Sequence, residues 1–133
     1  MALVVPNQGE SLMLQNDVNK TAPQDLVLQL YENNITPGES DTEATYTEAT
    51  FPGYAEKALA GASWSVPSEG DPTEIEFAMQ EFTATAAGKS VYGYIVVESS
   101  SGKLKWAERF TGAPYTLVNV GDKVQVTLKK TVE

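Results

Sequence analysis

Apolar residues recur at every second position in several short segments of this 133-residue chain. In residues 26–31, 73–79 and 123–129, an apolar side chain alternates with a more polar one, which is the pattern of a half-buried β-strand. Residues 91–98 are instead apolar on both faces, as in a central strand that is covered on both sides. This periodicity predicts a protein built mainly of strands.

Turn sequences separate these segments. The run SSSG at 99–102 lies between 91–98 and residues 104–110 (LKWAERF), so we expect these two strands to form an antiparallel hairpin. A further strand is expected at 62–66. Seven or eight short strands at regular spacing predict an all-β fold, an antiparallel β-sandwich of jelly-roll or immunoglobulin-like type, as a single domain over residues 1–133.

Three segments fall outside the regular strand pattern. We expect residues 1–10 to form an N-terminal arm and the polar residues 33–57 to form one long loop. Residues 11–20 fit a short helix capped by Ser11 as well as they fit a first strand. Loops as long as 33–57 are usually functional, mobile or ordered by a partner. We therefore expect partner contacts there.

The alternation slips by one position inside the strand at 73–83. Ile75, Phe77 and Met79 share one face, but Glu81 would follow them inward and Phe82 would point outward. One extra residue in the strand restores the phase. The sequence therefore predicts a β-bulge near Gln80 or Glu81 that returns Phe82 to the core.

The composition limits the chemistry available to the chain. It contains no cysteine and no histidine, which removes disulfides, thiolate nucleophiles, the commonest metal ligand and the commonest general base near neutral pH. We therefore expect no enzymatic activity, no cofactor and no metal centre. An acidic run at 39–43 leaves open a loop calcium site that is not of EF-hand type, with a solvated acidic loop as the plainer interpretation.

The charge is strongly acidic and unevenly distributed. The net charge is −9, with 14 acidic and 2 basic residues up to Glu81 but 4 acidic and 7 basic residues after it. Such a field disfavours nucleic-acid binding. This asymmetry has two interpretations. Either the C-terminal third presents a mildly basic surface to an acidic protein, or both sets of charges lie on solvated strand faces. No apolar run reaches the roughly 18 residues of a membrane span, and we expect neither a membrane partner nor Sec export.

The strand LKWAERF carries an acidic residue among aromatic ones. Alternation places Leu104, Trp106, Glu108 and Phe110 on one face. A catalytic Glu108 would have no histidine or cysteine to work with. Two interpretations remain. Glu108 pairs with a cation such as Lys57 or Arg109 of a neighbour, or it lies in a subunit interface where an arginine–carboxylate pair fixes the register.

Two other groups of side chains have both a functional and a plain interpretation. Glu74 and Glu76 share a strand face, as the paired carboxylates of a glycoside hydrolase would, but their alternation with apolar residues is typical of a solvated face. Four aromatic residues of the last strands are able to stack on sugars or to anchor a partner, unless they belong to the core. They are Tyr92, Tyr94, Trp106 and Tyr115.

Longer motifs carry a resemblance to a known group. The start MALVVPNQGE, the TPG–acidic–Thr loop leading to YTEAT and GYAEKAL, the ASW strand, VYGYIV and LKWAERF resemble small tailed-bacteriophage virion proteins similar to capsid cement (decoration) proteins. The resemblance runs from Leu3 to about Thr127. It implies a β-sandwich, made in the host cytoplasm, that binds as a homotrimer to the major capsid protein on the outer surface of the virion.

The resemblance sets the expected function and leaves two alternatives. The first alternative is a virion tail or head-fibre component that binds host-surface glycans through exposed aromatic residues, and the second is a glycoside hydrolase using its acidic faces. Under the cement interpretation, six residues are candidate subunit or capsid contacts, because they lie on the LKWAERF and VYGYIV strands or in the long loop. They are Glu108, Arg109, Tyr92, Tyr94, Asn34 and Thr36.

Overall fold

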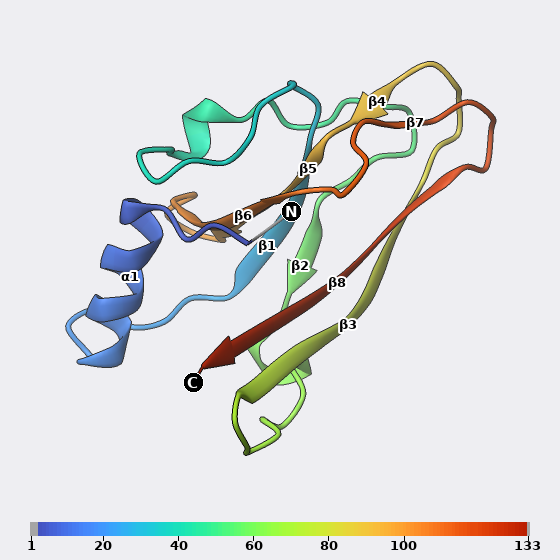
Figure 1. Cartoon of the computed structure of the whole chain (residues 1–133). Helices are drawn as coiled ribbons and strands as arrows, with labels where there is room; N and C mark the ends of the chain where they lie inside the picture. Colours follow the sequence, from blue (N-terminus) through green and yellow to red (C-terminus); the bar gives the residue numbers. More distant parts are fainter. Residues whose placement is uncertain (1–2, 133) are drawn as a thin grey trace.

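The structure is a computed structural model that describes residues 3–132, drawn in Figure 1. Every strand pair is antiparallel, which confirms the all-β, sandwich-like prediction. The main sheet has the order β2-β1-β5-β6, comprising β1 (Leu26–Tyr31), β2 (Lys57–Leu59), β5 (Gly93–Glu98) and β6 (Leu104–Arg109). A long ribbon pairs β3 (Thr73–Thr83) with β8 (Lys123–Val132), and a short one pairs β4 (Ser90–Val91) with β7 (Tyr115–Thr116).

The main core lies between the four-stranded sheet and the β3–β8 ribbon, which runs beside the sheet in Figure 1. Alternate residues of each strand point into this layer, as the period-two pattern predicts. The sheet contributes Leu28, Leu30, Tyr94, Val96 and Trp106, and the ribbon contributes Phe77, Phe82, Val124, Val126 and Leu128.

The second face of the main sheet is also covered. Val27, Tyr31, Ile95, Val97, Leu104 and Ala107 form a smaller cluster there. Ile35 and Tyr46, from the long segment after β1, pack against it. All six residues of β5 are consequently buried, as its apolar sequence predicts for a central strand.

The predicted bulge in β3 is present. The pairing passes from Phe77 opposite Leu128 to Gln80 opposite Val126, so β3 carries one residue more than β8 over this interval. The extra residue returns Phe82 to the core, where 1% of its surface is exposed.

A second bulge in β6 contradicts the expected faces of LKWAERF. Val96 pairs with Trp106 but Val97 pairs with Leu104, which leaves Lys105 as the extra residue. Leu104 therefore joins the smaller cluster while Trp106 joins the main core, so their predicted common face is wrong. Leu104, Lys105 and Trp106 alternate in polarity, so no change of pattern at Lys105 marks this bulge in the sequence.

The N-terminal region is helical, which corrects the expected arm at residues 1–10. Helix α1 (Asn7–Asp17) begins inside that segment and packs along β6, where the Gln8 side-chain oxygen accepts a hydrogen bond from the Leu104 amide at 2.8 Å. Val4 pairs with Ala107. The first two residues of the expected arm lie outside the described residues.

Residues 62–66 differ from the prediction, and the predicted long loop contains a short helix. The expected strand at 62–66 is wrong: Gly61–Ser63 is a 3-10 helix (η2), and Trp64 lies in the loop after it. Between Glu32 and Glu56 the one regular element is a 3-10 helix, η1 (Glu43–Thr45). Within residues 3–132, no helix has both the length and the apolar character that crossing a membrane requires.

Candidate functional site

Four of the predicted contact residues come together at the end of β6, in what we call the Arg109 corner (Arg109, Tyr92 and residues 34–36). The Arg109 guanidinium lies 5.2 Å from the ring centre of Tyr92 and donates a hydrogen bond to the Ile35 carbonyl at 2.9 Å. Asn34 and Thr36 flank Ile35 and are exposed. The corner therefore holds the long loop against the sheet and leaves Asn34 and Thr36 exposed.

Glu108 and Tyr94 form a separate pair on the main-core side of the sheet. The Tyr94 hydroxyl donates a hydrogen bond to the Glu108 carboxylate at 2.8 Å, and Tyr94 is 5% exposed. Burial, then this hydrogen bond, raises the pKa of Tyr94 well above its usual range. The expected partner Lys57 instead lies over the Phe82 ring, 5.3 Å from its centre, so Glu108 takes a tyrosine hydroxyl rather than that cation.

The two tyrosines of VYGYIV do not share a face as the alternation predicts. Tyr94 belongs to the main core together with Val91, whereas Tyr92 packs against the smaller cluster that contains Ile95. The strand is interrupted at Tyr92, between β4 and β5, and this break reverses the phase.

The Tyr94–Glu108 hydrogen bond gives a first stability prediction. Tyr94→Phe removes the buried donor to a carboxylate and should lower the free energy of unfolding by about 1–2 kcal/mol. Glu108→Gln keeps a side-chain acceptor, so it should lose less. Urea unfolding of both variants measures the difference. Equal and negligible losses of unfolding free energy would show that the Glu108 carboxylate does not stabilise the fold.

The lysines on the outer face of β8 neutralise carboxylates of β3. Lys129 lies 3.7 Å from the Glu74 carboxylate and 3.8 Å from that of Glu76. Lys123 lies 3.0 Å from Glu81, whose pKa is lowered by hydrogen bonds from Gln125 and Lys123. The charge asymmetry between the two parts of the sequence is thus partly matched within the ribbon.

The acidic loop turns its central carboxylate inward. Asp41 accepts hydrogen bonds from the Tyr46 hydroxyl at 2.7 Å and from the Gly38 amide at 2.8 Å. Among residues 3–132, no three acidic, cysteine or histidine side chains are grouped so as to hold a metal ion. The Asp41 carboxylate orders the loop.

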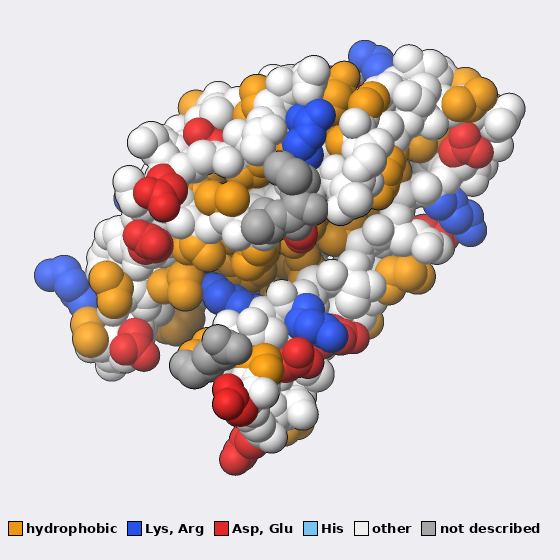
Figure 2. All heavy atoms as spheres, in the orientation of Figure 1, with side chains coloured by type: hydrophobic (Ala, Val, Ile, Leu, Met, Phe, Trp, Pro, Cys, Tyr) orange, Lys and Arg blue, Asp and Glu red, His pale blue; other side chains and the backbone are white. Residues whose placement is uncertain are grey.

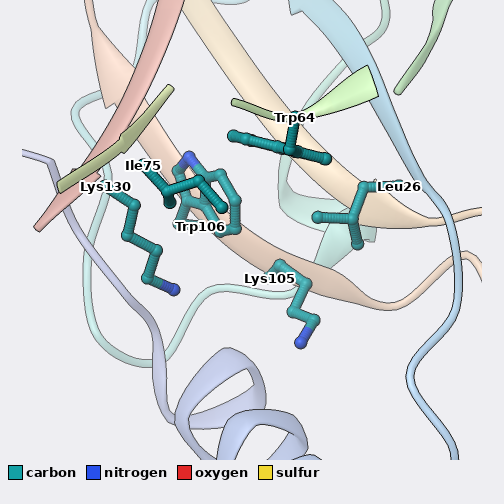
Figure 3. A pocket seen from close by; sticks show the side chains of 6 residues that line it. All are labelled: Leu26, Trp64, Ile75, Lys105, Trp106 and Lys130. Atoms are coloured by element: carbon teal, nitrogen blue, oxygen red, sulfur yellow. The ribbon is translucent and has the colours of Figure 1, made fainter. Parts of the chain in front are cut away.

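The most unusual surface is a groove that the sequence does not reveal. Figure 2 shows a hollow floored by apolar side chains between the β3–β8 ribbon and the rest of the molecule. At the end of this region near α1 lies a cavity of about 250 Å³, which we call the lysine groove. The lysine groove is lined by Leu26, Trp64, Ile75, Lys105, Trp106 and Lys130, shown in Figure 3.

Lys130 is held in this groove by apolar partners. Its ammonium lies 4.5 Å from the centre of the Trp106 ring and 3.2 Å from the Met13 sulfur of α1. It forms no ion pair with a carboxylate in the described part of the chain. Burial, with the nearby charge of Lys105, lowers the pKa of Lys130 to about 8.

Lys105 enters the same groove because of the bulge in β6. It is 9% exposed, and its ammonium donates a hydrogen bond to the Asn16 side-chain oxygen of α1 at 2.9 Å. Burial lowers its pKa, and the negative charge of Glu98 partly opposes this effect. In Figure 3 the side chains of both lysines extend towards the helix.

This arrangement is suited to binding an anion with an apolar body. Two ammonium groups lie in an apolar cavity, where charges interact more strongly than in bulk water. Both positive charges are disfavoured by burial, and an incoming carboxylate would stabilise them by Coulomb attraction. Perturbed pKa values of this kind are enriched at functional sites.

A second cavity of about 220 Å³ lies between β6 and β8, close to the Arg109 corner. Phe110 and Tyr115 stack beside it, with ring centres 4.8 Å apart and planes within 1°. Tyr115 is 40% exposed, and the polar side chains of Glu108 and Gln125 complete the wall. An exposed aromatic ring next to polar groups is an arrangement on which a sugar is able to stack.

No protein-family model, curated protein or solved structure matches this chain.

Proposed function

We propose that this protein is a bacteriophage capsid cement (decoration) protein that binds the major capsid protein on the outside of the head, acts without catalysis and assembles as a homotrimer. The structural observation that supports it best is the lysine groove, an open apolar cavity with two lysines that suits an acidic protein surface. The motifs from MALVVPNQGE to LKWAERF supply the resemblance to virion proteins.

The proposed mechanism is stabilisation by binding only the assembled shell. A protein that bridges adjacent capsomers binds the assembled lattice and not free subunits, so it shifts the equilibrium towards the shell by mass action. Many copies on a repeating lattice also allow each contact to be modest. The net charge of −9 fits a protein partner better than the phosphate backbone of DNA.

The test uses virions with and without this protein. We expect particles that lack it to lose a repeating outer density in electron microscopy and to release DNA at a lower temperature. Adding the purified protein should restore both properties at lattice stoichiometry. Particles that keep every surface density and the same heat stability would contradict the proposal.

A head- or tail-fibre component that binds host-surface glycans is the second candidate. The stacked pair of Phe110 and Tyr115 beside a polar cavity favours it. A glycan array would show binding that Tyr115→Ala abolishes, whereas Val118→Ala, at another exposed residue nearby in sequence, would leave it unchanged. Location on the capsid at lattice stoichiometry would exclude this candidate.

A further inference from the structure

We propose that the lysine groove binds an acidic peptide segment of a partner protein, in which an aromatic side chain lies next to a carboxylate. The inference rests on the proposed function, because it assigns this segment to the major capsid protein. It names the chemistry of the contact, which the resemblance alone does not supply.

The apolar walls of the groove select the aromatic side chain. Trp64 and Trp106 come from the loop after η2 and from β6, while Leu26 and Ile75 come from β1 and β3. The cavity of about 250 Å³ is smaller than the roughly 300–1,000 Å³ of small-molecule sites. It therefore suits one inserted side chain of a peptide better than a whole organic ligand.

The two lysines select the carboxylate. Among the described residues, the acidic groups near the two lysines do not fully neutralise them. Glu74 is paired with Lys129, and Glu98 only partly offsets the lowering of the Lys105 pKa by burial. Asn16 and Met13 of α1 offer a neutral oxygen and a sulfur. The groove therefore keeps a positive potential that a peptide carboxylate complements.

The groove is also extended, which favours a peptide segment over a single residue. A second hollow of about 210 Å³ shares Ile75 and Lys130 with it and continues along the ribbon to Pro67 and Val132. Its walls are almost wholly apolar. Lys130 lies where the two hollows meet, so a carboxylate bound there would lie next to an aromatic side chain inserted in the lysine groove.

Tryptophan fluorescence reports directly on this site, because both tryptophans of the chain line the groove. The probe is the peptide acetyl-Glu-Phe-Glu-amide, titrated into the full chain. We expect a saturable change in emission. Two matched peptides should each bind about tenfold more weakly, a loss of about 1.4 kcal/mol. Acetyl-Gln-Phe-Gln-amide lacks both carboxylates, and acetyl-Glu-Ala-Glu-amide lacks the aromatic ring.

Adjacent lysines of β8 provide the matched variants. Lys130→Met should weaken binding of acetyl-Glu-Phe-Glu-amide about tenfold. It should not lower the midpoint of thermal unfolding, because it removes a cation that burial disfavours. Lys129→Met makes the same change in charge outside the groove, at a residue paired with Glu74 and Glu76, and should leave peptide binding unchanged.

Binding should weaken as the pH rises through about 8. Lys130 loses its proton in this range, so the attraction for the peptide carboxylates falls, and Lys130→Met should flatten the profile. Lys105, whose pKa is also lowered, contributes in the same direction. The carboxylates of the peptide stay ionised throughout this range.

Three outcomes would overturn the inference. Equal peptide binding by wild type and Lys130→Met would remove the groove as the site. Equal affinity for 3-phenylpropanoate would show a site for small acids rather than peptides. Self-association that Lys130→Met abolishes in sedimentation would show that a second copy fills the groove.

The inference and the proposed function fail in distinguishable ways. If Lys130→Met still binds capsids with wild-type affinity, the capsid function stands and the groove is not the contact. If the peptides bind as expected but capsids do not, the groove keeps its assigned chemistry and the cement function is wrong.

Discussion

Phe82→Ala is expected to lower the free energy of unfolding by about 3–5 kcal/mol, the range for deleting a buried aromatic side chain. Phe82 is 1% exposed in the core between the main sheet and the β3–β8 ribbon. Its ring stacks on Tyr54 with centres 5.7 Å apart and lies under the Lys57 ammonium at 5.3 Å. The substitution therefore removes packing, an aromatic pair and a cation–π contact together.

Urea unfolding followed by circular dichroism measures this loss. Met79→Ala is the control, because Met79 lies in the bulge of the same strand and is 49% exposed, so its truncation should change the stability by less than about 0.5 kcal/mol. A loss below about 1 kcal/mol for Phe82→Ala would contradict both the bulge and the packing of the ribbon on the sheet.

Gly9→Ala is the second substitution with a large expected effect. A Cβ atom at Gly9 would overlap the backbone carbonyl of Lys105, and a backbone atom of a paired strand cannot move aside as a flexible side chain can. Forcing extra volume into a close contact costs about 1–3 kcal/mol, while alanine gains about 1 kcal/mol over glycine in a helix. Because the obstacle is backbone, we expect a net loss of about 2 kcal/mol.

This substitution should also impair the lysine groove. Moving α1 away from β6 withdraws Asn16 from Lys105 and Met13 from Lys130, so the affinity for acetyl-Glu-Phe-Glu-amide should fall with the stability. Gly70→Ala is the matched control, because its Cβ would make an ordinary contact at 3.5 Å with the Pro72 carbonyl. Equal unfolding midpoints for the two variants would show that α1 does not require a glycine against β6.

The two bulges show where sequence reasoning succeeded and where it did not. In β3 the apolar phase changes within the strand, so the extra residue near Gln80 is visible in the sequence. In β6 both faces are buried, and Leu104, Lys105 and Trp106 alternate in polarity across the bulge. The extra residue at Lys105 leaves no mark there, because a pattern of polarity identifies a face only where the two faces differ.

The candidate contact residues also show what the sequence suggests and what only the fold decides. The sequence suggested Arg109, Tyr92, Asn34 and Thr36 separately, and the fold brings them together through the Ile35 carbonyl. Glu108 is an unusual residue among aromatic neighbours, and its hydrogen-bond partner is Tyr94, which lies opposite it on the adjacent strand. Pairing across strands depends on register, which is a property of the assembled sheet.

The sequence by itself determined most of the strands, their antiparallel pairing, the buried central strand and the scarcity of catalytic groups. These follow from local periodicity and composition, which each segment carries alone. Only the tertiary structure decided that Lys105 and Lys130, 25 positions apart, line one cavity together with both tryptophans. That convergence depends on a bulge, on a helix packed against an edge strand and on a ribbon that diverges from the sheet, all of which are set by contacts between distant segments.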